Sequence, residues 1–131
     1  MDNCLALWAK KKEKDGIFYW LSLKRHLEDT RAVMGLLWEH WLSEGQRAYI
    51  AKSMKVEEDE AKSLAMFVGA IHDIGKATPA FQIKRGFQNS EDLDFLLLEK
   101  LERKGFSGIK DLELTDRGKT PHAYAGEVIC R

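Results

Sequence analysis

The sequence predicts an all-α fold, a helical bundle formed by one domain over residues 1–131. Apolar residues recur at spacings of three and four along several segments, which is typical of helices with one buried face. Almost no stretch alternates between polar and apolar residues, as a half-buried strand would. Hydrophobic residues make up 44% of the 131 residues, enough for one core, and no apolar run has the length of a membrane span. These features indicate a single helical domain and exclude an integral membrane protein.

A short N-terminal segment containing Trp8 precedes the first predicted helix, at residues 24–44. The apolar stripe of this helix consists of Leu27, Thr30, Val33, Met34, Leu37, Trp38 and Trp41. Because the stripe continues the face on which His26 lies, we expect the His26 imidazole to point inward. A hydrogen-bonded core histidine without a further role is the alternative. We interpret His40, late on the same helix, as a surface residue.

A short helix around residues 46–54 and a longer one over residues 56–75 are expected next. The apolar stripe of the longer helix consists of Ala61, Leu64, Ala65, Phe67, Val68 and Ile71. Acidic residues fill positions 57–60, where the helix dipole favours negative charge. We expect Gly75 to end this helix, which places His72 and Asp73 in its last turn.

The remaining segments also carry helix boundary signals. Thr78 and Pro79 are expected to be the cap and first position of a short helix, and Ser90 and Gly105 bracket a helix over residues 91–104. The Gly and Asp content of residues 105–119 indicates a loop. Thr120 and Pro121 predict the start of a last helix, with His122 in its first turn.

The adjacent residues His72 and Asp73 are the main candidates for chemistry. Imidazole nitrogen suits first-row transition metals, and a carboxylate can bridge two of them. Further ligands must then come from other segments, and His26 and His122 are the best placed. The alternatives are a buried, hydrogen-bonded His72 beside an exposed Asp73, and an exposed first-turn His122.

Charge and cysteine content give weaker indications. The 21 basic and 21 acidic residues cancel, which argues against strong nonspecific binding of duplex DNA. Two local basic runs, residues 10–12 and 84–85, are interpreted either as solvated faces or as phosphate contacts. Cys4 and Cys130, near opposite ends, indicate reduced thiols, and together with the absence of a signal peptide they predict a cytoplasmic location.

The order of these motifs resembles the HD nuclease domain of the CRISPR-associated type I helicase-nuclease. The specific part is the run over residues 70–82, AIHDIGKATPAFQ. Generic HD phosphohydrolases share His-Asp and often Gly-Lys, whereas the continuation TPAFQ and the upstream HLEDT at residues 26–30 point to the CRISPR branch. The resemblance covers essentially the whole chain, including the Pro121-His122 pair.

This resemblance implies an HD-domain helical bundle that hydrolyses phosphodiester bonds of single-stranded DNA at a dinuclear metal site. The cofactor implied is a divalent transition metal, one of Mn, Co, Ni, Fe or Zn. Carried over to this sequence, the metal ligands are His26, His72, Asp73 and His122. Asp73 is the bridging ligand and, with Lys76, the catalytic pair.

The resemblance also implies partners for the domain. These are single-stranded DNA, a helicase domain of the same or a partner chain, and a crRNA-guided surveillance complex that recruits the nuclease in antiviral defence. Lys84 and Arg85, close behind the metal-site run, are the expected nucleic-acid contacts. No membrane partner is implied.

The sequence departs from the family pattern at its C-terminal end. The family continues with a further histidine or histidine pair and a late aspartate, whereas this chain ends at Arg131. We therefore expect a C-terminally truncated, N-terminal fragment of a larger HD nuclease domain, inactive alone and inclined to self-associate through exposed apolar surface.

Two other functions stay open at this point. An HD-type nucleotide phosphohydrolase would use the same ligands on a small substrate in a closed pocket. A noncatalytic helical interaction module would use the four tryptophans as an interface, although core packing is the simpler role for most of them.

Overall fold

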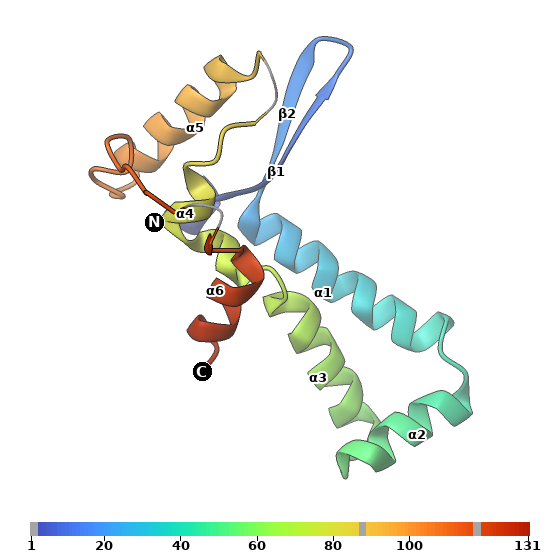
Figure 1. Cartoon of the computed structure of the whole chain (residues 1–131). Coiled ribbons are helices and arrows are strands. Elements are labelled where there is room, and N and C mark those ends of the chain that lie inside the picture. The colour runs from blue at the N-terminus through green and yellow to red at the C-terminus, as the bar shows by residue number, and fades with distance from the viewer. Residues whose placement is uncertain (1–2, 87–88, 117–118) are drawn as a thin grey trace. The chain divides into compact units, whose positions relative to one another are not determined.

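The computed structural model describes residues 3–86, 89–116 and 119–131, and most of them are helical (Figure 1). The elements in chain order are η1 (Asn3–Ala6), β1 (Trp8–Lys14), β2 (Ile17–Ser22), α1 (Leu23–His40), α2 (Glu44–Met54), α3 (Glu58–Ile71), η2 (Ile74–Ala77), α4 (Pro79–Gln82), α5 (Glu91–Arg103) and α6 (His122–Ile129). The contacts group them into two units, Met1–His26 with Asp73–Arg131, and Leu27–His72. The predicted helical fold class is confirmed, with one small sheet added.

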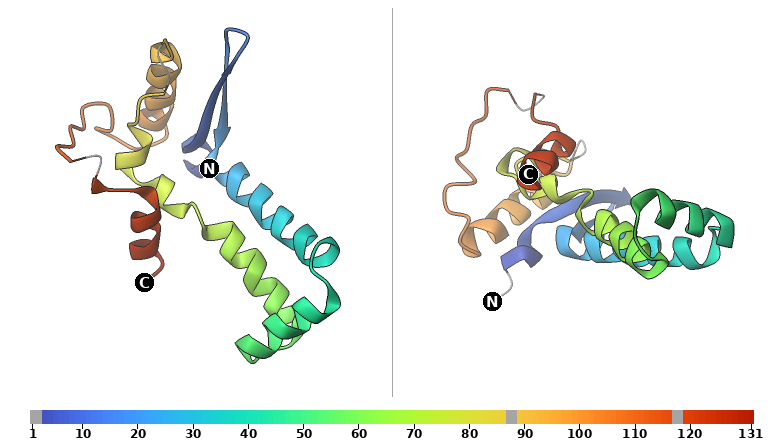
Figure 2. Two further views of the ribbon diagram at one scale, coloured as in Figure 1. Left: turned by 45° about the vertical axis from the view of Figure 1, so that its right-hand side comes forward. Right: turned by 90° about the horizontal axis from the view of Figure 1, so that it is seen from below.

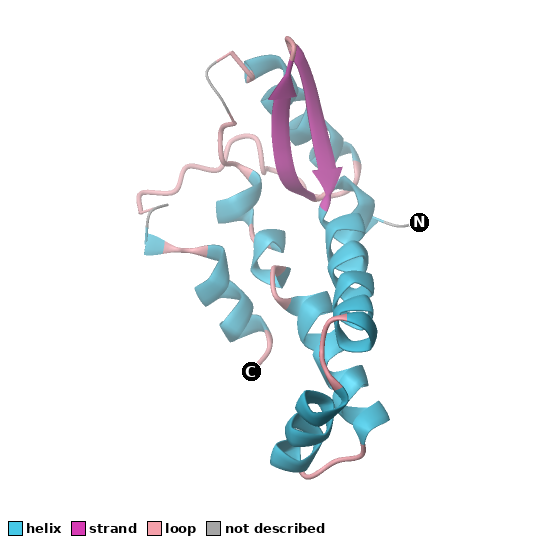
Figure 3. Ribbon diagram, turned by 90° about the vertical axis from the view of Figure 1, so that its right-hand side faces the viewer, coloured by secondary structure: helices cyan, strands magenta, loops and turns pink. Residues whose placement is uncertain are grey.

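That sheet is an N-terminal hairpin, which the sequence analysis missed. Strands β1 and β2 pair antiparallel from Trp8 opposite Ser22 to Lys14 opposite Ile17 (Figure 3). The turn between them is formed by Asp15 and Gly16, with φ angles of 55° and 76°. Two successive left-handed residues match the twist of a two-residue hairpin, and Asp-Gly is among the sequences that adopt them most readily. The turn dipeptide therefore favours a hairpin here, although polar and apolar residues alternate only weakly along the two strands.

The core of the first unit lies where this hairpin meets α4 and α5. Trp8, Phe81 and Leu97 form the buried cluster, and the half-buried Trp20 and Leu93 pack against it. The rings of Trp8 and Phe81 lie 4.6 Å apart, centroid to centroid. The hairpin is thus part of the folded core and holds β1 against the segment that follows Asp73.

Helix α6 packs against η2 at a point of very close backbone approach (Figure 2). A Cβ atom built on Gly75 would lie 1.8 Å from the His122 carbonyl oxygen and 2.5 Å from the Gly126 nitrogen. The expectation that Gly75 ends the preceding helix is wrong. Helix α3 already ends at Ile71, and the chain passes through Asp73 at φ −113° and ψ 16° into η2. Gly75 is needed for contact with α6.

The second unit consists of α1 from Leu27 onward, α2 and α3. Trp38, Ala51 and Ala61 form its buried cluster. Ser43 and Gln46 form a capping box at the start of α2, which fixes the turn after α1. Gly69 lets α3 approach α1, because a Cβ there would lie 2.5 Å from Met34 Cγ. The small residues of the unit therefore set its helix packing.

The predicted apolar stripes are only partly buried. Trp38 on α1 is 5% exposed, whereas Trp41 is 76% exposed. The other members of the two stripes that are exposed are Val33, Leu37, Leu64, Phe67 and Val68. The interpretation of these residues as buried is wrong, because the contact of α3 within its unit is narrow and centred on Ala61 and Ala65.

The later segments follow the sequence analysis closely. Helices α4 and α5 agree with the predicted helices after Thr78 and Ser90. Residues 105–116 contain no helix or strand. Pro121 is the N-cap of α6 rather than its first helical residue, so the helix begins at His122. In the described part of the chain no helix combines the length and apolar character needed to cross a membrane.

Candidate metal centre

The Asp73 carboxylate is the meeting point of three chain segments of the first unit. Its side chain is 13% exposed and lies at the N-cap of η2. Oδ2 lies 2.8 Å from His26 Nε2 and 2.7 Å from Lys76 Nζ. Oδ1 lies 3.2 Å from His122 Nε2. Residues 26 and 122 are thus brought to one carboxylate from opposite ends of the sequence.

His26 reaches Asp73 from the first turn of α1 and is 8% exposed. The hairpin delivers it there, because β2 runs directly into α1 and the Leu23 amide donates to the Leu7 carbonyl at 2.7 Å. The expectation that its imidazole points inward is confirmed.

His72 is exposed and precedes Asp73 directly, so the peptide bond keeps the two side chains in one neighbourhood. Its Nδ1 lies 2.8 Å from the Gly69 carbonyl oxygen. A carbonyl oxygen only accepts hydrogen bonds, so Nδ1 carries the proton and Nε2 of the neutral ring keeps its lone pair. One ligand atom from each of His26, His72 and Asp73 lies within 4.8 Å of the other two.

His122 is oriented by the packing of α6. Its ring lies 5.6 Å from that of Phe81 in an edge-to-face arrangement, with an interplanar angle of 73°. The close contact of Gly75 with the backbone of His122 and Gly126 brings the first turn of α6 next to η2. The His122 side chain is 36% exposed, so one side of the group remains open to solvent.

Lys76 adds a buried positive charge to the same place. Its side chain is 10% exposed, and its ammonium group pairs with Asp73. Burial of an ammonium ion is costly unless an anion and hydrogen bonds compensate it. The Lys76 carbonyl in turn accepts a hydrogen bond from Gln82 Nε2 at 2.8 Å, which fixes the turn that carries Lys76.

Gln82 and Trp8 form a supporting contact that the sequence analysis did not identify. Gln82 is 1% exposed. Its Oε1 accepts from the Trp8 amide at 3.1 Å, its Nε2 donates to the Trp8 carbonyl at 2.8 Å, and its carbonyl accepts from the Trp8 indole at 3.0 Å. The sequence did mark Gln82 as notable, since it is the last residue of the family-specific run over residues 70–82. Its partner lies 74 positions away and carries no local pattern.

Other candidates lie outside this group. The His40 side chain is 72% exposed, which agrees with a surface residue. Lys84 and Arg85 line a separate pocket, with Lys84 Nζ 5.2 Å from the Phe81 ring centroid. In the first basic run, Lys11 is buried and pairs with Asp94, so a wholly solvated face is wrong there. Alternation along β1 turns this one lysine inward.

The donor set around Asp73 fits a divalent transition metal. It combines imidazole nitrogens with one carboxylate whose two oxygens both face imidazole groups, and these are the ligand types preferred by such ions. Neutral imidazole and ionised carboxylate are the forms that bind metal, so an ion would take the place of the protons now shared between them. An adjacent His-Asp pair, a distant histidine and a helical frame are the combination that is typical of HD domains.

Comparison with known proteins identifies the family within the HD domains. The family model described as "Cas3, HD domain" matches residues 8–131, and the chain belongs to this family. The CRISPR-associated nuclease/helicase Cas3 of Streptococcus thermophilus is 56% identical over 125 residues, which cover 93% of this chain and 14% of that protein. The chain therefore spans a small part of the length of this relative. No solved structure gives a significant match. The resemblance inferred from the sequence is confirmed.

Proposed function

We propose that this chain belongs to the metal-dependent nuclease domain of a CRISPR type I interference protein, which acts on phosphodiester bonds of single-stranded DNA. The observation that carries the proposal is the Asp73 carboxylate, buried between His26, His122 and Lys76 beside the exposed His72. Membership of the Cas3 HD family supports it. The same family supports a helicase domain in the same or a partner chain and recruitment by a crRNA-guided complex, in the cytoplasm.

His26, His72, Asp73 and His122 would hold the metal, with Asp73 shared between two ions. Bound ions supply Lewis acidity, which lowers the pKa of water and neutralises charge on the scissile phosphate. Mn, Co, Ni, Fe and Zn all suit this donor set.

The protein groups have distinct tasks in this proposal. The Nδ1–H of His72, held by the Gly69 carbonyl, fixes the tautomer whose Nε2 can bind metal. The ammonium group of Lys76 holds Oδ2 of Asp73 and places a positive charge where negative charge develops on the phosphate. Phe81 fixes the ring plane of His122. All of these groups are in place before substrate arrives, which avoids the cost of arranging them during the reaction.

The proposal is tested first by metal binding. Calorimetric titration of the chain with Mn²⁺ and Co²⁺ should show binding that Asp73→Asn and His72→Ala weaken at least tenfold, because each removes a ligand. His40→Ala is the matched control, since it removes an exposed histidine outside the group. Equal affinity in Asp73→Asn and His40→Ala would contradict the assignment.

The second measurement is the cleavage of DNA by the protein in its natural full-length form. Single-stranded DNA should be degraded with Mn²⁺ or Co²⁺, and Asp73→Asn should abolish the reaction whereas His40→Ala should not. Hydrolysis of mononucleotides with no cleavage of DNA would replace the proposal by a nucleotide phosphohydrolase.

A further inference from the structure

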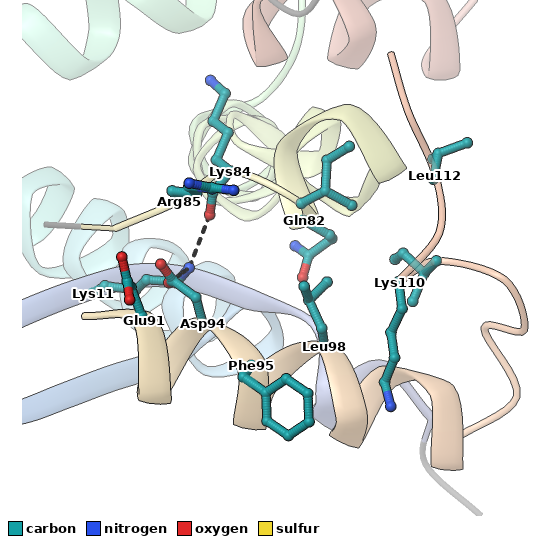
Figure 4. A pocket seen from close by; sticks show the side chains of 12 residues that line it. Lys11, Gln82, Lys84, Arg85, Glu91, Asp94, Phe95, Leu98, Lys110 and Leu112 are labelled. Atoms are coloured by element: carbon teal, nitrogen blue, oxygen red, sulfur yellow. Dashed lines mark hydrogen bonds and ion pairs between the residues drawn. The ribbon is translucent and has the colours of Figure 1, made fainter. Parts of the chain in front are cut away.

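A pocket of about 420 Å³ lies in the first unit, and its lining contains none of the residues of the Asp73 group (Figure 4). Four segments form it: β1, residues 82–85, α5 and residues 109–112. Its volume lies within the range of about 300–1,000 Å³ that is usual for small-ligand sites. The lining residues used below are Lys11, Arg85, Glu91, Asp94, Phe95 and Lys110.

One acidic side chain in this pocket is already neutralised. Lys11 Nζ donates to Asp94 Oδ1 and to the Lys84 carbonyl, while Asp94 Oδ2 accepts from the Gly86 amide at 2.8 Å and from Ser90 Oγ at 3.1 Å. Burial lowers the pKa of Lys11 despite its pairing with Asp94. For Asp94 burial acts to raise the pKa, but the hydrogen bonds from Lys11, Gly86 and Ser90 outweigh it and hold the pKa below its usual value.

The remaining charges favour an anion. The lining contains four basic residues and two acidic ones, an excess of two positive charges in a chain whose overall charge is zero. With Lys11 and Asp94 paired, three basic residues remain against Glu91. Lys84 Nζ lies 5.2 Å from the Phe81 ring centroid, whereas Arg85 and Lys110 are exposed cations on different segments. A ligand bridging residues 85 and 110 would therefore gain from carrying phosphate.

The pocket also presents an exposed aromatic ring. Phe95 on α5 is 58% exposed, and Lys110 Nζ lies 5.4 Å from its ring centroid. An exposed phenylalanine next to a lysine, in a pocket that an arginine also lines, suits a base that stacks on the ring while its phosphates meet the cations. Proteins that bind single strands commonly combine these two elements.

We propose that this pocket binds one nucleotide unit of a single-stranded DNA, with the base on Phe95 and the adjoining phosphates on Arg85 and Lys110. The proposal rests on the proposed nuclease function and adds to it a substrate site outside the metal centre. Its role is to hold the strand on the same structural unit that carries Asp73. Stacking is indifferent to sequence, so the site should accept every base.

The base contact is tested by fluorescence anisotropy in EDTA, which removes metal-dependent binding and cleavage. Two labelled strands are compared, oligothymidylate and an abasic strand of equal length. Phe95→Ala should weaken binding of oligothymidylate by about tenfold and leave the abasic strand unchanged, because only the former has a base to stack. Leu96→Ala is the control, since Leu96 is 59% exposed on the same helix but does not line the pocket.

The phosphate contacts are tested by salt dependence. Arg85→Ala and Lys110→Ala should each reduce the slope of log affinity against log salt by about 0.7, the value for one phosphate contact on a single strand. Arg103→Ala removes an exposed arginine paired with Glu99 on the same helix and should leave the slope unchanged. Circular dichroism verifies that all variants are folded.

Three results would overturn the proposal. They are no binding of oligothymidylate by the unmodified chain, equal loss for both strands in Phe95→Ala, or thymidine monophosphate binding as tightly as the strand. These outcomes are separable from failure of the proposed function, because strand binding is measured in EDTA without metal, whereas the proposed function is tested by metal titration and by DNA cleavage.

Discussion

Replacing Gln82 by leucine tests how strongly the structure depends on the contact between Gln82 and Trp8. The glutamine side chain accepts from the Trp8 amide at 3.1 Å and donates to the Trp8 and Lys76 carbonyls at 2.8 Å each. Leucine has a similar size but provides no donor or acceptor. Because Gln82 is 1% exposed, water cannot readily replace the three lost hydrogen bonds.

The expected loss of stability follows from the three backbone groups that lose their partner: the Trp8 amide, the Trp8 carbonyl and the Lys76 carbonyl. Each buried polar group left without its partner costs about 1–3 kcal/mol, and the apolar contacts of leucine offset part of the total. We expect the free energy of unfolding of the first unit to fall by about 3–5 kcal/mol, well above the value of about 1 kcal/mol that is typical of single substitutions.

Urea unfolding followed by far-ultraviolet circular dichroism measures this loss. Gln46→Leu is the matched control, because the Gln46 side chain accepts one hydrogen bond, from the Ser43 amide, at an exposed helix cap. Its loss should cost about 1 kcal/mol or less. Trp8→Phe, which keeps the backbone hydrogen bonds to Gln82 and loses the indole donor, should fall between the two. A loss in Gln82→Leu no greater than in Gln46→Leu would refute the reasoning.

Three further substitutions probe other parts of the structure. Gly75→Ala places a methyl group 1.8 Å from the His122 carbonyl oxygen, so it should separate α6 from η2 and accelerate proteolysis of α6, whereas Gly45→Ala, with nothing within 4 Å, should not. Trp38→Ala should lower the free energy of unfolding by about 3–5 kcal/mol and Trp41→Ala by about 0.5 kcal/mol or less, measured in thermal melts, because Trp38 is 5% and Trp41 76% exposed. The pKa of Asp94 is lower in the folded chain than its ordinary value of 3.8, so the unfolded chain takes up the proton first and the stability contributed by Asp94 is lost as the pH falls below that value. Asp94→Asn should remove this part of the acid dependence in urea titrations between about pH 2 and 5, and an unchanged pH profile would contradict it.

The helices and the histidine-aspartate pair could be predicted because their signals are local. Apolar spacing and capping residues identified α1, α2, α5 and the start of α3 within a few positions. The inward direction of His26 was predicted from the helical face that it shares with Thr30, Val33 and Leu37. The prediction is right for His26, although Val33 and Leu37 on that face are themselves exposed. His26 and His122 lie 47 and 49 positions from Asp73, so no local pattern links them to it. The residues alone made them candidate partners beside simpler alternatives, and the family resemblance selected that hypothesis.

What could not be predicted depends on contacts between distant segments. Helical spacing shows which residues are apolar but not which face another element covers, so Phe67 and Trp41 were placed inside and lie outside. Glycine is a common helix terminator, and nothing local to Gly75 announces that the backbone of residues 122–126 occupies the space beside it. The hairpin is different, because Asp15-Gly16 is a local turn signal that the sequence analysis did not use.

Because Gly75 contacts Gly126 directly, the arrangement of side chains around Asp73 does not depend on the length of the chain between these two glycines. A backbone-to-backbone contact fixes α6 by its own surface, so the position of His122 does not depend on the path of residues 105–116, which contain no helix or strand. Loop closure entropy grows only slowly with length. Insertions at the exposed residues 115–116, beyond the buried Ile109 and the pocket residue Lys110, should therefore be tolerated. This makes them a suitable place to insert a reporter domain or a cleavage site while the four side chains around residue 73 stay together.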